Sequence, residues 1–154
     1  MIKSLKKNNV FKLKTKIVNT LMKNGKKKTG EKILLKSIKN IQRTTSKNSK
    51  SVLQLAIINS TPTFKLNEQI VKKGKRKAVK ITPSFINKDS LRIMMSLKLL
   101  KMSISKSKSS NKFYESLSKE LIVSAFLKSQ TVGKKNELQK QVLMNKRYLS
   151  KFRW

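Results

Sequence analysis

The 154-residue sequence contains no cysteine and no histidine. These absences exclude disulfides, thiol nucleophiles, zinc fingers and every metal site or acid–base mechanism built on imidazole. Acidic residues are scarce as well, and the six are scattered: Glu31, Glu68, Asp89, Glu115, Glu120 and Glu137. No two of them lie close enough in the sequence to suggest a catalytic pair. We therefore expect no enzymatic activity, no metal, no cofactor and no small-molecule substrate.

The charge is strongly one-sided, with 39 lysines and arginines and a formal net charge of +33. Such a chain repels itself and is typical of proteins that bind a polyanion, nucleic acid first of all. Apolar residues nevertheless make up 37% of the chain and recur periodically, which distinguishes it from a disordered basic tail. No apolar run approaches the 18 or more residues of a membrane-spanning helix, so we expect no membrane span.

Hydrophobic periodicity predicts a mainly α fold, a six-helix bundle with one protruding β-hairpin between the third and fourth helices. A basic arm over 1–9 precedes a single domain over 10–154. The expected helices cover 10–23, 27–43, 51–60, 87–103, 112–128 and 134–148, and the hairpin covers about 63–82 with Gly74 near its tip. Asn24 and Gly25 end the first helix, Thr82-Pro83 closes the hairpin, Asn87 caps the fourth helix, and Gly133 breaks the chain before the last helix. The linkers are 44–50 and 105–111.

The same periodicity assigns an apolar face to each of the first five helices. In the helix at 10–23 these are Val10, Phe11, Ile17, Val18, Leu21 and Met22, and in the helix at 27–43 they are Ile33, Leu34, Leu35, Ile38 and Ile41. The helix at 51–60 has Val52, Leu55, Ala56 and Ile58, and the helix at 87–103 has Leu91, Met94, Met95, Leu97, Leu99 and Met102. The helix at 112–128 has Phe113, Leu117, Leu121, Ile122, Ala125 and Phe126.

Two basic stripes are the most informative local pattern. In the first helix Lys12, Lys16, Asn19 and Lys23 share the side opposite the apolar stripe, and in the second Lys28, Lys32, Lys36, Lys39 and Arg43 are aligned. A solvated face is the plain alternative, but such a face normally interleaves acids with its lysines, and here they are nearly absent. We therefore interpret the stripes as phosphate-binding surface.

The turn between these two helices reads Asn24-Gly25-Lys26-Lys27-Lys28 and opens the second helix, whose positive N-terminus favours phosphate. The spacing of a nucleotide-binding P-loop is missing. Two further basic segments are the hairpin tip, with Lys72, Lys73, Gly74, Lys75, Arg76 and Lys77, and a C-terminal docking segment with Lys146, Arg147, Phe152, Arg153 and Trp154. No row of solvent-facing aromatic residues predicts a base-stacking platform.

The run from Lys16 to Lys28, Lys-Ile-Val-Asn-Thr-Leu-Met-Lys-Asn-Gly-Lys-Lys-Lys, resembles the first conserved block of small-subunit ribosomal protein seven. The segment from Leu55 to Asn59 followed by Thr61-Pro62-Thr63 is similar to that family's third helix and hairpin entry, and Phe152-Arg153-Trp154 is similar to its C-terminal ending. The resemblance covers about residues 10–154. Lys65, Met94-Met95, the position of Asn145-Lys146 and the serine- and lysine-rich linker depart from the family pattern.

This resemblance implies a primary rRNA-binding protein that organises the 3′ major domain, or head, of the small ribosomal subunit. Other head proteins would be neighbours, and the hairpin would reach toward mRNA and the exit-site tRNA. The expected rRNA-binding residues are Lys12, Lys16, Asn19, Lys23, Gly25, Lys26, Lys27, Lys28 and Lys32. Recognition should rest mainly on RNA shape and backbone, so affinity should fall steeply with salt.

Two other classes share the charge: a nucleoid-type basic DNA-binding protein and a basic amphipathic protein of membrane surfaces. The former does not predict the block from Lys16 to Lys28, and the latter does not predict a compact bundle with a hairpin. Lysine outnumbers arginine 34 to 5, which indicates an AT-rich genome. We therefore expect the mitochondrial matrix as the compartment, with the plastid or the cytoplasm of an AT-rich bacterium as alternatives. The shortness of 1–9 favours synthesis inside the organelle.

Overall fold

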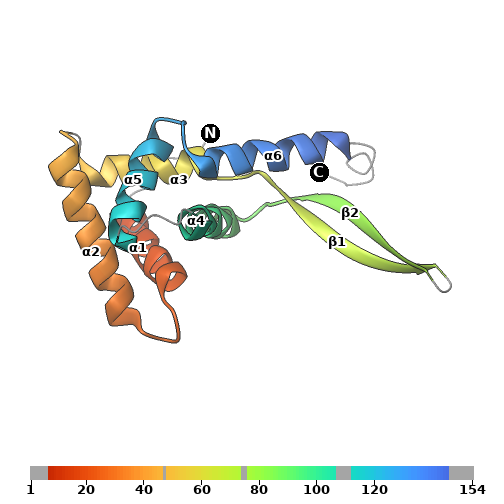
Figure 1. Ribbon diagram of the computed structural model, residues 1–154, viewed down its shortest axis with the longest axis horizontal. Coiled ribbons are helices and arrows are strands. Elements are labelled where there is room, and N and C mark those ends of the chain that lie inside the picture. Colours follow the sequence, from red (N-terminus) through yellow and green to blue (C-terminus); the bar gives the residue numbers. More distant parts are fainter. Residues whose placement is uncertain (1–6, 47, 74–75, 107–111, 146–154) are drawn as a thin grey trace.

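The computed structural model describes residues 7–46, 48–73, 76–106 and 112–145. Within these residues it contains six helices and one antiparallel hairpin, as the sequence predicts (Figure 1). The elements in chain order are α1 (Lys7–Leu21), α2 (Lys27–Thr44), α3 (Ser49–Ser60), β1 (Phe64–Lys73), β2 (Arg76–Phe85), α4 (Asp89–Lys106), α5 (Phe113–Ala125) and α6 (Gln130–Met144). The helices gather around one core, whereas the hairpin projects from the bundle (Figure 1).

The core lies where α1 to α5 meet, and its buried apolar residues are Leu13, Ile17, Val18, Leu34, Ile41, Val52, Leu53, Ala56, Ile57, Leu97, Leu100, Ile104, Leu117 and Leu121. Among the residues whose burial is described, no strand residue belongs to this cluster. The bundle therefore has its own hydrophobic stabilisation, independent of the hairpin.

Several residues of the predicted apolar faces are exposed: Leu35, Leu55, Ile58, Leu91, Met94, Met102, Phe113 and Phe126. The side chains of Val10 and Phe11 lie outside the described residues. Small residues take the inward positions where helices cross. Ser37, Ser60, Ser96, Ser118 and Ser124 are buried, and the Ser60 hydroxyl lies 2.9 Å from that of Ser96, joining α3 to α4. Close helix crossings leave no room for larger side chains, and each buried hydroxyl is satisfied by a hydrogen bond.

The hairpin ladder is longer than predicted at both ends. Phe64 pairs with Phe85 at the base, and Lys73 pairs with Arg76 at the distal end, so only residues 74 and 75 lie between the strands. The expected closure at Thr82-Pro83 is wrong, because the ladder continues through Pro83, opposite Leu66. A two-stranded ribbon consists only of edge strands, which tolerate the missing N–H of proline.

Most helix boundaries differ from expectation by one to four residues. Helix α1 covers 7–21 rather than 10–23, so it begins inside the arm expected over 1–9 and ends before Asn24 and Gly25. Three further differences concern a predicted cap, helix end or chain break. The fourth helix begins at Asp89, so Asn87 is not its N-cap, and α5 ends at Ala125, before Leu127 with its positive φ of 63°. Helix α6 begins at Gln130, four residues earlier than predicted, because the Ser129 hydroxyl caps it by accepting from the Val132 N–H at 3.1 Å. The Glu120 carboxylate adds a second cap by accepting from the backbone N–H and the hydroxyl of Thr131.

Gly133 therefore lies in the first turn of α6 rather than breaking the chain, and a Cβ added there would meet nothing within 4 Å. We expect Gly133→Ala to raise the free energy of unfolding by about 0.5–1 kcal/mol, because alanine loses less backbone entropy in a helix. Gly25→Ala is the matched control: at φ +72° it should lower stability by about 1 kcal/mol. Urea unfolding in sulfate-containing buffer measures both; a loss of stability in Gly133→Ala would contradict this account.

Candidate nucleic-acid interface

The turn between α1 and α2 presents an anion-binding geometry. Asn24 and Gly25 have φ of 51° and 72°, which reverses the chain and directs it into α2. The first turn of α2 holds no acid, and its N-cap residue, Lys26, provides no side-chain hydrogen bond to the backbone N–H groups there. The Lys27 N–H donates to the Gly25 carbonyl at 2.8 Å. The side chains of Lys23, Lys26, Lys27 and Lys28 are all exposed. Four cations around an uncapped helix N-terminus are suited to binding phosphate.

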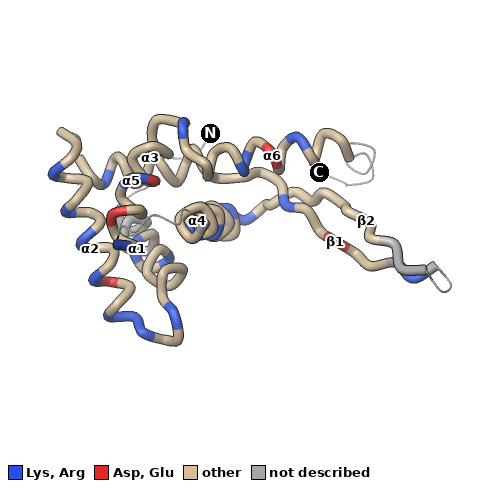
Figure 2. The backbone as a smooth tube through the Cα atoms, in the orientation of Figure 1, with Lys and Arg blue, Asp and Glu red and all other residues tan. Residues whose placement is uncertain are grey.

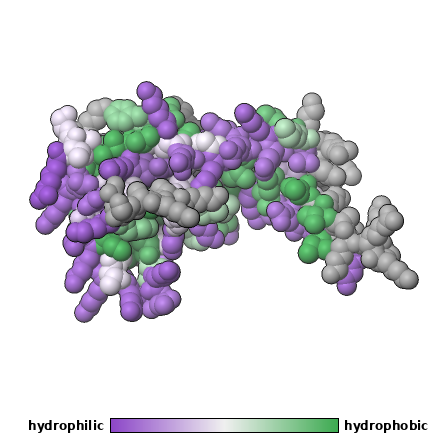
Figure 3. All heavy atoms as spheres, viewed as in Figure 1, coloured by the Kyte–Doolittle hydropathy of each residue, from purple (hydrophilic) through white to green (hydrophobic). Residues whose placement is uncertain are grey.

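The basic stripe continues along α2. Lys28, Lys32, Lys36, Lys39 and Arg43 are exposed, and the stripe runs the length of the helix over about 22 Å, at about 1.5 Å per residue (Figure 2). In the space-filling view, hydrophilic residues dominate the side of the molecule formed by α1 and α2 (Figure 3). Within the described residues one ion pair forms, between Arg92 and Asp89 at 3.9 Å, so these cations are not neutralised by carboxylates there.

The predicted stripe on α1 is less uniform. Asn19 is exposed, but Lys16 is half-buried and its ammonium donates a hydrogen bond to the Ser90 hydroxyl at 2.8 Å, linking α1 to the start of α4. The side chain of Lys12 lies outside the described residues. Lys16 thus has a contact within the fold besides any role toward RNA.

Other cations act inside the bundle, which the sequence did not indicate. Lys101 donates to the Thr20 carbonyl at 2.7 Å, Lys134 to the Ser103 hydroxyl at 2.8 Å and Lys135 to the Asn59 carbonyl at 2.8 Å. Desolvation by burial lowers the pKa of Lys135. Each of these bonds joins residues at least 31 positions apart, so no local pattern signals it.

Near the distal end of the hairpin the strand register pairs basic residues with one another. Lys72 faces Lys77 and Lys73 faces Arg76 in the strand register. Directly opposed cations destabilise a ladder, and an isolated two-stranded hairpin is only marginally stable. Toward the middle of the ribbon Ile70 and Val79 are paired and remain 69% and 62% exposed. This combination favours a polyanionic partner at the distal end.

The remaining predicted site residues fall on parts of the chain that the structure does not describe. These are Gly74 and Lys75 at the hairpin tip, and Lys146, Arg147, Phe152, Arg153 and Trp154 in the C-terminal segment. The backbone of Lys73, Arg76 and Lys77 is described, but their side chains are not. The docking role of that segment stays a prediction. Among residues 7–46, 48–73, 76–106 and 112–145, no helix is long and apolar enough to span a membrane, and no group of three acidic side chains is placed to hold a metal.

Comparison with known proteins gives a consistent result. A family model described as ribosomal protein S7p/S5e matches residues 2–146. The small ribosomal subunit protein uS7 of Mycoplasma mobile is 30% identical over 140 residues, covering 91% of this chain and 85% of that protein. The small ribosomal subunit proteins uS7c of Euglena longa and Tetradesmus obliquus are 26% and 29% identical over 142 and 132 residues. These matches cover 90% and 86% of this chain and 77% and 76% of those proteins. The chain therefore belongs to the ribosomal protein S7p/S5e family.

Proposed function

We propose that this protein is a structural constituent of the small ribosomal subunit that binds rRNA directly and organises the head. The main support for this proposal is the structure of the α1–α2 turn. There, exposed cations surround an uncapped helix N-terminus, in the same Lys16–Lys28 block on which the family resemblance rests. The family match over residues 2–146 supports the same assignment.

In this proposal the helical bundle is the rigid frame, and the turn and the start of α2 bind phosphates of the head rRNA. The contacting residues are Lys12, Lys16, Asn19, Lys23, Gly25, Lys26, Lys27, Lys28 and Lys32. The hairpin projects from the bundle (Figure 1). In this proposal its distal end reaches toward mRNA and exit-site tRNA. Other head proteins lie nearby, and the protein acts by binding rather than by catalysis. Phosphate contacts fix its position, and RNA shape supplies the selectivity.

A competition experiment separates this function from a nucleoid role. The purified protein is bound to a labelled transcript of the rRNA head domain, and unlabelled duplex DNA or unlabelled head RNA is added at matched salt. We expect the RNA to compete at a concentration at least about tenfold lower, because DNA offers the charge without the shape. Equal competition by duplex DNA would overturn the ribosomal assignment in favour of a DNA-compacting protein.

The compartment is a separate proposal. We propose the mitochondrial matrix, and the support is the lysine-rich, arginine-poor composition of an AT-rich genome. Fractionation of cells followed by immunodetection tests it. Recovery of the chain with mitochondrial ribosomes is the expected result, whereas recovery from plastids or from a bacterial cytoplasm would assign it to one of those compartments instead.

A further inference from the structure

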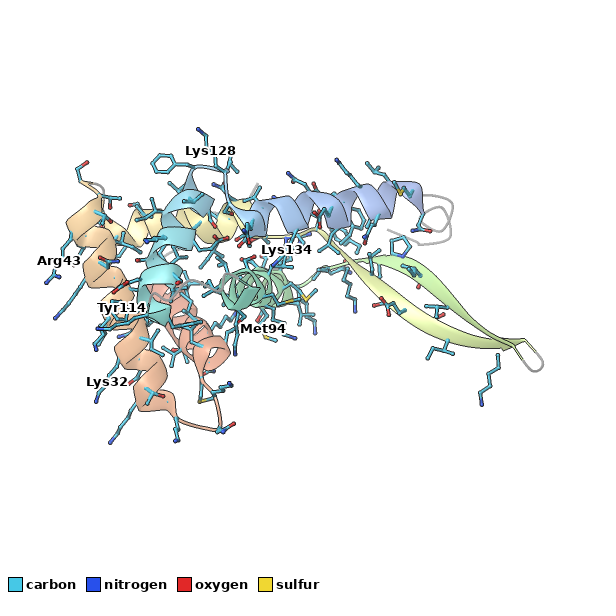
Figure 4. All side chains as sticks on the ribbon, in the orientation of Figure 1. Lys32, Arg43, Met94, Tyr114, Lys128 and Lys134 are labelled. Carbon is cyan, nitrogen blue, oxygen red and sulfur yellow. The ribbon has the colours of Figure 1, made fainter. Side chains whose placement is uncertain are left out.

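Helices α2 and α5 pack against each other and leave an open groove of about 540 Å³ between them. Four cations line it, Lys36, Lys39 and Arg43 from α2 and Lys119 from α5, against one carboxylate, Glu115. Figure 4 shows Arg43 and Lys32 along α2, with Tyr114 on α5 between their levels. The groove therefore follows the C-terminal half of α2, whereas the α1–α2 turn lies at its N-terminus.

The charge of this groove is not compensated within the described part of the chain. None of the four cations forms an ion pair with a described acid, and Lys39, Arg43 and Lys119 are exposed. Gathering like charges on two walls is unfavourable for the isolated protein. The arrangement is favourable only when an anion enters between the walls.

The two walls are held together by specific contacts. The Asn40 side-chain amide donates to the Ser118 hydroxyl at 2.6 Å, and the Lys36 ammonium lies 5.6 Å from the centroid of the Tyr114 ring. The Ser118 hydroxyl in turn donates to the Glu115 carbonyl at 2.8 Å, so its orientation is fixed. A groove whose walls are already joined loses little entropy on binding.

We propose that this groove is a second RNA site, which takes the sugar–phosphate backbone of a segment other than the one held at the α1–α2 turn. The inference rests on the proposed function. Along α2, Lys28 at the turn is about 12 Å from Lys36, the first residue of the groove lining, and about 22 Å from Arg43. Both distances exceed the screening length of about 8 Å at physiological salt, so the turn and the groove contact different phosphates. RNA is favoured over an acidic protein segment because the stripe connects the groove to the turn as one line of cations. The groove also offers the aromatic surface of Tyr114 beside its cations.

Salt dependence provides the first test. The groove variant combines Lys39→Gln, Arg43→Gln and Lys119→Gln. The matched control combines Lys50→Gln, Lys128→Gln and Lys140→Gln, because these three lysines are exposed and lie outside the groove. Each lost phosphate contact lowers the log–log slope of affinity against salt by roughly 0.7–0.9. We expect a decrease of roughly 2 in the groove variant and of less than about 1 in the control. Equal slopes for the two variants would overturn the proposal.

A tethered probe provides the second test and distinguishes the two proposals. Because the chain lacks cysteine, Lys119→Cys or Lys27→Cys carries a single iron–EDTA group that cleaves RNA nearby. Discrete cleavage from Lys119→Cys, at rRNA positions different from those cut from Lys27→Cys, is the expected result. Cleavage from Lys27→Cys alone would refute the groove site and leave the proposed function intact. Cleavage from neither position would contradict the proposed function itself.

A third readout excludes a protein occupant. Small subunits that contain the groove variant are isolated and their protein content is compared with that of subunits containing the control. Under our proposal the protein content is the same and only RNA contacts change. Loss of one neighbouring protein, with unchanged RNA cleavage from the tethered probe, would assign the groove to an acidic protein segment and overturn the RNA proposal.

Discussion

Replacing Lys26, Lys27 and Lys28 with glutamine is expected to lower the affinity for head rRNA by about tenfold or more and the log–log salt slope by roughly 2. The three ammonium groups are exposed beside an α2 N-terminus that lacks a side-chain cap. Their replacement therefore removes phosphate contacts and leaves the packing of the fold unchanged. Filter binding to a head-domain transcript across a salt series measures both quantities.

Folding should survive this change, because the turn conformation depends on the positive φ of Asn24 and Gly25 and on the Lys27 N–H to Gly25 carbonyl bond of 2.8 Å. The variant carrying Lys50→Gln, Lys128→Gln and Lys140→Gln removes the same charge elsewhere and should retain most of the affinity. If the two triple variants bind equally well, the turn is not the principal anchor.

Excising the distal hairpin is expected to separate assembly from function. Joining Asn67 to Thr82, which pair directly in the ladder, by an Asn-Gly turn removes residues 68–81. The core contains no strand residue, so the free energy of unfolding in sulfate buffer should change by less than about 1 kcal/mol. Incorporation into small subunits should remain near normal, while translation should fall severalfold because the proposed contact with mRNA and exit-site tRNA is removed.

The matched comparison for the excision is a full-length variant with Lys72, Lys73, Arg76 and Lys77 replaced by glutamine. It keeps the ribbon and removes the opposed cations, so a similar loss of translation would attribute the effect to charge. Sucrose-gradient sedimentation reports assembly, and an in vitro translation assay reports output. Failure of the excised protein to enter subunits would mean that the hairpin, rather than the turn, anchors the protein.

The elements of the fold could be predicted because the signals are local. The bounds of α2 differ from the prediction by one residue, since an Asn-Gly turn precedes it and its apolar residues recur at helical spacing. The start of α6 was misplaced because Gly133 was interpreted as a helix breaker. The cap that starts this helix combines the adjacent Ser129 with Glu120, a residue from α5.

Burial was harder to predict than secondary structure, because it depends on which helices cross. Leu35 and Leu55 have the expected apolar character but are 49% and 46% exposed, whereas Ser37 and Ser60 are fully buried. At these helix crossings the size of the side chain, rather than its hydrophobicity, decides which residue is buried.

The candidate site was partly predictable for a similar reason. The turn and the α2 stripe are contiguous in sequence and could be recognised there. The α2–α5 groove forms only when two helices meet. Tyr114 and Lys119 of α5 are more than 70 residues along the chain from the α2 residues that share the groove, Lys36, Lys39 and Arg43. Nor could the sequence separate surface lysines from Lys101, which is bonded to a carbonyl 81 residues away.

The most direct test of the central claim, that this protein binds head rRNA through the α1–α2 turn, is crosslinking in cells followed by sequencing of the bound RNA. We expect crosslinks to concentrate in the 3′ major domain of small-subunit rRNA and to fall sharply when Lys26, Lys27 and Lys28 are replaced by glutamine. Crosslinks spread evenly over unrelated RNAs, or an unchanged pattern in the triple variant, would contradict this claim.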